Sequence, residues 1–205
     1  MLELKHIYKT FNPGTVNEKR ALVDLNLHLQ EGDFVTVIGG NGAGKSTMLN
    51  IISGAYSVDS GAITIGGVDV TKLPEHKRAA FIGRVFQDPM MGTAATMQIE
   101  ENLALAARRG RKRGLKIGIT SGEREQYREL LKILDLGLEE RLTAKVGLLS
   151  GGQRQALTLL MATLQRPKLL LLDEHTAALD PKTAAKVLAA TEEIVNRDHL
   201  TTLMI

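Results

Sequence analysis

One segment of this 205-residue chain constrains its fold more than any other. Gly39–Ser46 reads GGNGAGKS, a glycine-rich loop that ends in Lys45 and Ser46. It follows an apolar run at 34–38, which predicts a strand buried on both faces, and it precedes a helical pattern at 45–53. Glycines let the backbone aim successive N–H groups at an anion, and the helix adds its positive end. This order predicts a phosphate-binding α/β domain.

The polar residues of the loop have separate expected roles. Lys45 places a full charge against the β- and γ-phosphates, and the Ser46 hydroxyl is a ligand for Mg²⁺. A glycine-rich turn with a surface lysine would need no phosphate, but all the fixed positions and both flanking elements favour the nucleotide site. The residues expected to bind nucleotide here are Gly39, Gly40, Asn41, Gly42, Ala43, Gly44, Lys45, Ser46 and Thr47.

The remaining strand patterns are of two kinds. Residues 2–7 and 25–29 alternate apolar with polar side chains, which predicts an antiparallel portion with one wet face. The continuous run Leu169–Leu172 predicts a second strand buried on both faces. Further strands are expected at 82–86 and 200–205, with a helix at 181–197 between strands.

Between about 90 and 164 the patterns are helical only. Helices are expected at 99–109, after a capping box at Thr120 and Glu123, and at 153–164. We therefore expect an α/β fold with a P-loop NTPase core, a mostly parallel sheet, an antiparallel N-terminal β portion and an inserted helical subdomain. The predicted division is a core of 1–89 and 165–205 and a subdomain of about 90–164.

Two acids follow the apolar run 169–172. Asp173 and Glu174 stand at the carboxyl end of a buried strand, the edge where ligands of open α/β sheets bind. Alone, such a pair is more often a solvated turn or a helix cap. Beside a phosphate loop, Asp173 is expected to hold Mg²⁺ and Glu174 to act as general base for an attacking water.

Composition excludes several classes of protein. The chain has no Cys, so disulfides and thiolate metal sites are impossible. A net charge of +3 and 3% aromatic residues argue against nucleic acid as a partner. The apolar runs are too short to span a bilayer and the N-terminus lacks the core of a signal peptide, so membrane association must come through a partner.

A second glycine turn precedes the helix predicted at 153–164. It places a hydroxyl and two glycines at a helix N-terminus, in the order Ser150, Gly151, Gly152, Gln153. No residue like Lys45 accompanies it. A second copy of the chain could bring this turn to a nucleotide held by the first loop.

Leu149–Gln153 reads LSGGQ and lies between the phosphate loop and the acidic strand. With this motif in this position, the chain resembles the ABC ATPase family. The resemblance covers essentially its whole length. The resemblance implies that ATP and Mg²⁺ are the cofactors and that two subunits pair head to tail as a homodimer. It also implies that Ser150, Gly151 and Gly152 grip the γ-phosphate bound to the partner.

Other positions are matched by the same resemblance. Phe11 is similar to the aromatic that stacks on adenine, with Tyr8 as a rival and a core role as the plainer alternative. Gln87 resembles the glutamine that contacts Mg²⁺ and links core to subdomain. Asp180 resembles a residue at the dimer interface and is also expected to cap the helix that follows. His175 stands where many relatives carry Pro, and we interpret it as a structural variant.

One family position is not matched. A switch histidine is expected just after the strand 200–205, but the sequence ends at Ile205, and His199 precedes that strand. We therefore expect a C-terminally truncated form that binds ATP and hydrolyses it slowly.

The resemblance implies a transport ATPase that works with transmembrane permease subunits. Residues 87–105 are similar to bacterial importer subunits that act with an extracytoplasmic solute-binding protein on amino acids or similar small solutes. The expected location is cytoplasmic, on the inner face of the cell membrane through its partners. The alternatives are an exporter-type or lipoprotein-releasing ATPase, and a soluble ATPase of translation or DNA repair.

A basic cluster lies within the predicted subdomain. It could meet anionic headgroups, but a solvated basic loop is the preferred interpretation. Its members are Arg108, Arg109, Arg111, Lys112, Arg113 and Lys116.

Overall fold

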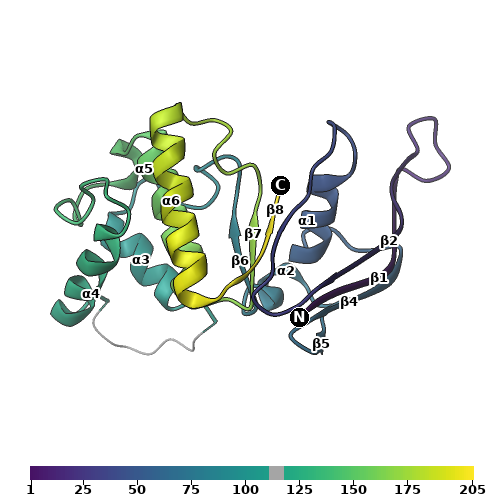
Figure 1. Ribbon diagram of the computed structural model, residues 1–205, viewed down its shortest axis with the longest axis horizontal. Coiled ribbons are helices and arrows are strands. Elements are labelled where there is room, and N and C mark those ends of the chain that lie inside the picture. Colours follow the sequence, from purple (N-terminus) through teal and green to yellow (C-terminus); the bar gives the residue numbers. More distant parts are fainter. Residues whose placement is uncertain (111–117) are drawn as a thin grey trace. The chain divides into compact units, whose positions relative to one another are not determined.

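The computed structural model describes residues 1–110 and 118–205 (Figure 1). The described chain forms two compact units. Unit 1 comprises Met1–Gly83, Lys168–Asp173 and His199–Ile205, and unit 2 comprises Arg84–Pro167 and Glu174–Asp198. Each unit is therefore built from segments that are distant in the sequence. The division into a core and a subdomain with limits at 89/90 and 164/165 stays a prediction.

Unit 1 contains an antiparallel sheet with the strand order β2-β1-β4-β5. The strands are β1 (Leu2–Phe11), β2 (Lys19–Leu29), β4 (Ser60–Ile65) and β5 (Val68–Asp69). Apolar side chains alternate toward one face, as the sequence pattern predicts. The expected antiparallel N-terminal portion is confirmed.

A second sheet has the order β3-β8-β7-β6, and its strands are β3 (Phe34–Thr36), β6 (Ile82–Val85), β7 (Leu169–Leu172) and β8 (Thr201–Met204). β8 pairs in parallel with both β3 and β7. All four leucines of β7 are fully buried, as predicted. The prediction for 34–38 was wrong in extent and burial: Phe34 is 47% and Ile38 91% exposed. β3 is an edge strand of this sheet, so fewer neighbours cover it.

Helix α1 (Lys45–Ser53) lies between the antiparallel sheet and the strands β7 and β8 of unit 1 (Figure 1). Its apolar face shares one core with residues of both sheets, because β-sheets and helices must each bury an apolar side. The buried face consists of Met48, Leu49, Ile51 and Ile52. The short helix α2 (Glu75–Arg78) precedes β6.

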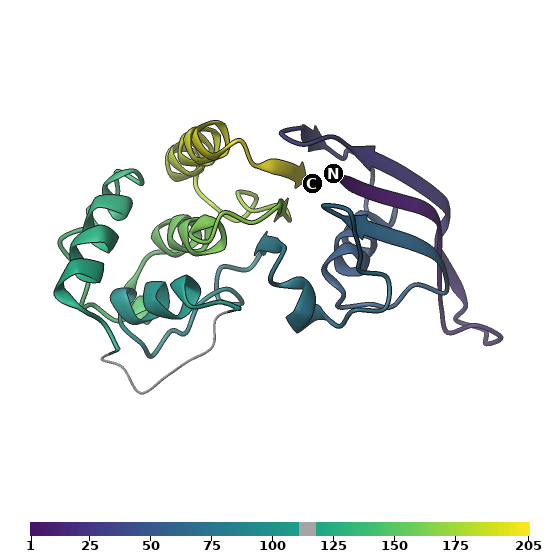
Figure 2. The same cartoon turned by 90° about the horizontal axis from the view of Figure 1, so that it is seen from below.

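Unit 2 is helical, and Figure 2 shows it from a second direction. Its elements are α3 (Ile99–Ala107), α4 (Ser121–Lys132), the 3-10 helix η1 (Val146–Leu148), α5 (Gly151–Thr163) and α6 (Pro181–Asp198). α5 packs against α3, α4 and α6. No helix in the described ranges combines the length and apolar character that a bilayer span requires.

Candidate functional site

The phosphate loop joins β3 to α1 within unit 1. Gly42 and Gly44 both have left-handed backbones, with φ of 82° and 92°. A Cβ at Gly44 would lie 2.6 Å from the carbonyl oxygen of Ala21. Only glycine therefore fits the last position of the loop without strain.

The N-terminus of α1 has no internal cap. Its N-cap residue Gly44 makes no side-chain hydrogen bond, and the first turn contains no acidic residue. In α4 and α5, by contrast, a side chain at the N-cap accepts a hydrogen bond from the helix backbone. The first N–H groups of α1 and its positive dipole end thus suit an external anion.

Lys45 folds back over the same loop. Its Nζ donates hydrogen bonds to the carbonyl oxygens of Gly39, at 2.7 Å, and Gly40, at 3.2 Å. The ammonium group is therefore already held above the turn whose N–H groups would receive phosphate. The neighbouring Ser46 is exposed on the first turn of the helix. The glycine turn, the uncapped start of α1 and the Lys45 ammonium group together suit the phosphates of a nucleoside triphosphate.

Two aromatic candidates for the adenine ring lie in the same unit. Phe11 ends β1 and meets Tyr56 edge to face, with 5.4 Å between ring centroids. The Nζ of Lys9 lies 5.6 Å from the Phe11 centroid, and it pairs with Asp59 at 3.0 Å. Tyr8 is 38% exposed on the same strand. Stacking by Phe11 stays a prediction.

The two residues of the acidic pair belong to different units. Asp173 follows β7 directly and belongs to unit 1 with the phosphate loop, whereas Glu174 belongs to unit 2. Glu174 has a left-handed backbone with φ of 42°, unusual for a residue other than glycine. Its carbonyl oxygen accepts a hydrogen bond from the Ala177 N–H at 3.0 Å.

The donor set for a metal is sparse without nucleotide. In the described ranges, no three His, Asp or Glu side chains are grouped to hold a metal ion. Magnesium is commonly bound by one or two carboxylates together with phosphate oxygens and water. Within unit 1, Asp173 and Ser46 are donors of the right kind, and they would need the phosphates to complete the coordination.

Gln87 follows β6 in unit 2 and is exposed. The backbone just before it is fixed by α5, because Gln155 Nε2 donates to the Phe86 carbonyl oxygen at 2.9 Å. Gln155 is only 1% exposed. The sequence analysis missed this contact, although a polar residue on a predicted buried helix face would have been its signal.

The LSGGQ turn opens α5 with a reciprocal cap. The Gln153 N–H donates to Ser150 Oγ at 3.2 Å, and the Ser150 N–H donates to Gln153 Oε1 at 3.1 Å. This is a capping box, which satisfies two backbone donors internally. Two backbone donors of the α5 turn therefore need no ligand.

The two glycines of this turn differ in their surroundings. A Cβ at Gly152 would overlap the Cγ2 of Thr183 on α6. At Gly151 the nearest atom would be Leu179 Cδ2, at 4.0 Å. Gly152 therefore has a packing role inside unit 2, which the sequence analysis did not foresee.

Asp180 caps α6 as predicted. Its Oδ1 accepts from the Thr183 N–H at 3.1 Å, and its carbonyl oxygen accepts from the Ala184 N–H at 2.8 Å. The side-chain and backbone hydrogen bonds of Thr183 lower the pKa of the Asp180 carboxyl below its ordinary value. Its role at a dimer interface stays a prediction.

A buried arginine that the sequence analysis missed supports the other end of α1. Arg78 is 2% exposed, and its Nη1 donates to the carbonyl oxygens of Ile51 and Ile52 at 2.7 and 3.0 Å. Burial lowers the pKa of the guanidinium. A cation at the C-terminus of α1 favours the helix whose N-terminus faces the phosphate loop.

The described members of the basic cluster bind within unit 2. Arg108 donates to the Gly118 carbonyl oxygen at 2.6 Å and to Glu123 Oε1 at 2.8 Å. Arg109 donates to the Ala162 carbonyl oxygen at 3.2 Å, and burial lowers its pKa. Neither is a freely solvated cation. The remaining members lie outside the described residues: Arg111, Lys112, Arg113 and Lys116.

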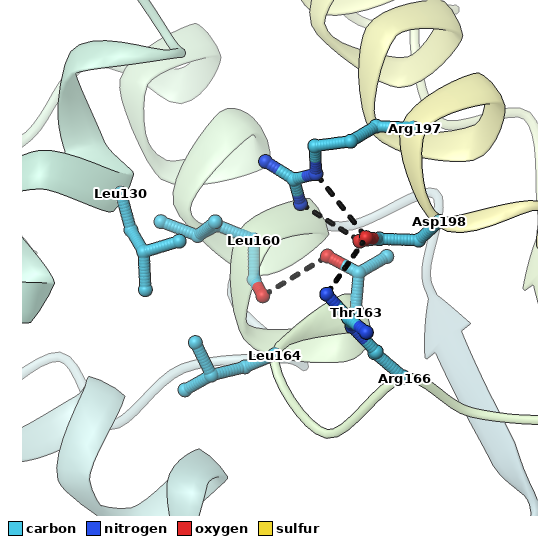
Figure 3. Close-up of a pocket in the computed structure, with 7 residues that line it drawn as sticks. All are labelled: Leu130, Leu160, Thr163, Leu164, Arg166, Arg197 and Asp198. Atoms are coloured by element: carbon cyan, nitrogen blue, oxygen red, sulfur yellow. Dashed lines mark hydrogen bonds and ion pairs between the residues drawn. The ribbon is translucent and has the colours of Figure 1, made fainter.

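Unit 2 also contains a cavity of about 340 Å³ (Figure 3). Asp198 lies in its wall and pairs with Arg197 at 2.7 Å and Arg166 at 3.5 Å. The other lining residues are Leu130, Leu160, Thr163 and Leu164. None of the residues predicted to bind nucleotide lines this cavity.

The loop of unit 1 defines the class: a strand, a glycine turn with lysine, and an uncapped helix form a phosphate-binding α/β protein. Comparison with protein families then matches residues 22–177 to the family described as ABC transporter. The chain belongs to the ABC transporter family, as one of its ATP-binding subunits, and it is an ATPase. The resemblance inferred from the sequence is thereby confirmed.

Curated relatives carry transport names. The chain is 45% identical to a tyrosine transport ATP-binding protein of Clostridioides difficile (strain R20291) over 206 residues, covering all of this chain and 81% of the relative. It is 35% identical to the methionine import ATP-binding protein MetN of Vibrio vulnificus (strain YJ016), covering all of this chain and 57% of the relative. The chain thus spans little more than half of the methionine relative.

Solved structures confirm the fold. The post-hydrolysis dimer of the ATP-binding cassette MJ0796, bound to ADP and Pi, matches with a TM-score of 0.81 and 32% identity, over 100% of this chain and 87% of that one. The ADP conformation of MJ1267, an ATP-binding cassette of an ABC transporter, matches with a TM-score of 0.79 and 27% identity, over 100% and 80%.

Proposed function

We propose that this chain binds Mg-ATP at its phosphate loop and hydrolyses it when a second copy adds its LSGGQ turn. The observation that carries the proposal is the uncapped start of α1 beneath a glycine loop and the Lys45 ammonium. A helix end of this kind is stabilised by phosphate, since its N–H groups have no internal acceptor. The MJ0796 cassette is a dimer in its post-hydrolysis state, which supports pairing of two copies.

The residues divide the work as follows. Lys45 and the loop N–H groups hold the β- and γ-phosphates, and Phe11 stacks on the adenine ring. Ser46, Asp173 and Gln87 hold Mg²⁺, which when bound offsets the negative charge that grows on the phosphates. Ser150, Gly151 and Gly152 of the second copy grip the γ-phosphate, and Asp180 lies at the interface; Thr47 and Gln153 complete the two turns.

Glu174 is the proposed general base. It accepts a proton from water as the water oxygen bonds to the γ-phosphorus and the bond from that phosphorus to the bridging oxygen breaks, leaving ADP and phosphate. Its position directly after Asp173, at the carboxyl end of β7, supports this role.

We further infer that the ATPase drives import of an amino acid or a similar small solute. Its support is the relatives' names, which state tyrosine transport and methionine import. The partners would be transmembrane permease subunits and an extracytoplasmic solute-binding protein, with this chain on the inner face of the membrane. Copurification from membranes would test this: recovery of a polytopic membrane subunit supports it, and recovery of ribosomes or DNA instead would refute it.

Glu174→Gln tests the catalytic assignment. The amide cannot accept the proton, so nucleotide binding should persist while turnover falls by at least about 100-fold. With ATP, the variant should accumulate as a dimer measurable by light scattering after chromatography. Glu192→Gln is the matched control, because Glu192 is an exposed acid of the same unit on α6. Wild-type turnover by Glu174→Gln would exclude Glu174 as the base.

A further inference from the structure

His175 is a buried imidazole that the proposed chemistry leaves without a role. It directly follows Glu174 and is only 3% exposed. Burial lowers the pKa of this imidazole to about 4. A ring held in the interior must find a hydrogen-bond partner there for its polar nitrogen atoms.

The imidazole is tied to α6. Its Nε2 lies 3.3 Å from Thr191 Oγ1, a longer than average hydrogen bond. Thr191 Oγ1 is also 2.7 Å from the Val187 carbonyl oxygen. A carbonyl can only accept, so the single hydroxyl proton goes to Val187. The hydroxyl oxygen must then accept from the ring, so Nε2 of His175 carries a proton.

This contact anchors the backbone beside an unusual residue. Glu174 has φ of 42°, which a side-chain-bearing residue keeps only where its surroundings hold it. The turn that follows is closed by the Ala177 N–H to the Glu174 carbonyl oxygen and by the Leu179 N–H to the Thr176 carbonyl oxygen. The His175 ring ties the start of this turn to α6 by a side chain that lies inside unit 2.

We propose that His175 is a positioning residue for Glu174, acting through its hydrogen bond to Thr191. The ring and the hydroxyl lock the peptide after Glu174, and this directs the Glu174 carboxylate toward the attacking water. Because the His175 ring is buried, it acts on the reaction only through Glu174. The proposal rests on the function of Glu174 proposed above.

Leu and Gln at position 175 separate the hydrogen bond from packing. His175→Leu fills the space without a donor, whereas His175→Gln keeps an amide N–H2 near the position of Nε2. We expect kcat to fall about 10-fold or more in His175→Leu with KM for ATP unchanged, since misplaced catalytic groups slow the chemical step. His175→Gln should recover most of that loss. A purely structural role would lower thermal stability in both variants and leave kcat unchanged.

Thr191→Val tests the other partner. It keeps the side-chain shape but removes the acceptor for the ring. Its kcat should fall to the level of His175→Leu, and combining the two should cause no further loss. Thr163→Val is the matched control: Thr163 is also a buried threonine, 3% exposed, whose hydroxyl donates to a carbonyl four residues earlier, that of Leu159 on α5. That control should keep wild-type kcat.

Two further measurements decide the remaining cases. ¹⁵N NMR of the wild type should show a proton on Nε2 of His175, and a ring protonated only at Nδ1 would overturn the proposal even if the variants fail to fold. Glu174→Gln, assayed in parallel, tests the base itself. If Glu174→Gln loses turnover while His175→Leu keeps it, the positioning role is wrong and the proposed function stands. If Glu174→Gln turns over normally, the proposed base has failed.

Discussion

Helices α1 and α5 both begin at glycine turns of similar composition, but their N-termini are capped differently. At α1 the cap residue is Gly44, with a left-handed backbone and no side-chain bond to the helix. At α5 the cap residue is Ser150, which exchanges hydrogen bonds with Gln153. The turn of α1 has a lysine ammonium folded over it, and that of α5 has none.

Capping and the lysine, rather than glycine content, therefore distinguish how the two turns can bind an anion. An uncapped helix with lysine can bind phosphate strongly by itself, because its donors have no competing acceptor. In a helix with a capping box, side chains already satisfy donors of the first turn. Such a helix needs no anion for its stability, and an anion bound there is an additional contact. The first turn is therefore suited to primary binding, and the second to completing a site supplied by another chain.

The largest expected effect is at the turn of α1. Lys45→Ala removes the only cationic side chain in the loop, and hydrogen bonds to charged groups contribute about 3 kcal/mol, or about 100-fold in Kd. Fluorescent ATP titration measures it. The control Lys77→Ala, an exposed lysine of α2, should bind as the wild type does. If Lys45→Ala bound ATP as tightly as the wild type, the lysine would not distinguish the turn of α1 from the turn of α5.

The next effect is in the packing of α5. Gly152→Ala forces its new methyl group against Thr183, and such overpacking costs about 2 kcal/mol in the free energy of unfolding. Gly151→Ala, with no atom nearer than 4.0 Å, should cost less. Urea denaturation measures both. Adding Thr183→Ser, which removes the obstructing Cγ2, should restore most of the loss. Equal costs for the two glycines would contradict the packing role.

A smaller effect on stability is expected when the serine hydroxyl at the start of each helix is removed. Ser150→Ala removes the N-cap of α5 and should lower the free energy of unfolding by about 1 kcal/mol without nucleotide. Ser46→Ala at α1 should change it by less than about 0.5 kcal/mol, because that hydroxyl lies on the surface away from a cap. Thermal unfolding without nucleotide compares them. A larger loss in Ser46→Ala would mean that α1 depends on an internal cap after all.

The smallest effect concerns a charged cap and its pH dependence. The Asp180 carboxyl has a lowered pKa in the folded chain, so the stability it contributes is present above its unfolded pKa and is lost as pH falls through the folded one. Stability should therefore decline below about pH 4. Asp180→Asn should flatten that decline slightly, whereas Ser150→Ala should leave its pH profile unchanged. Parallel acid titrations by circular dichroism measure this, and identical profiles for Asp180→Asn and wild type would contradict it.

Local signals were enough to predict the elements that hold the site. Helix α1 begins and ends where its pattern predicts, at Lys45 and Ser53, because glycines flank it on both sides. The capping box of Thr120 and Glu123 and the cap at Asp180 were predicted from residues within one helical turn. The run 169–172 is buried on both faces as its continuous leucines require. Such features depend on neighbours within one helical turn or one strand.

The surroundings of several residues could not be predicted in the same way. The same kind of apolar run misled at 34–38, since nothing in it says that β3 lies at a sheet edge. Arg78 gave no sign that it would be buried against the end of α1. The contact between Gly152 and Thr183 joins residues of two different helices. Chain folding, not local pattern, brings such residues together.

The sequence alone determined the class of the protein, because a glycine loop with Lys45 and the LSGGQ turn are short motifs whose chemistry is contained in adjacent residues. Only the tertiary structure decided which of the two turns is self-capped, what packs against Gly152 and where the His175 ring binds. The physical reason is range: backbone conformation and helix capping are set within a few residues, whereas burial and side-chain partners depend on segments that meet only after the chain has folded.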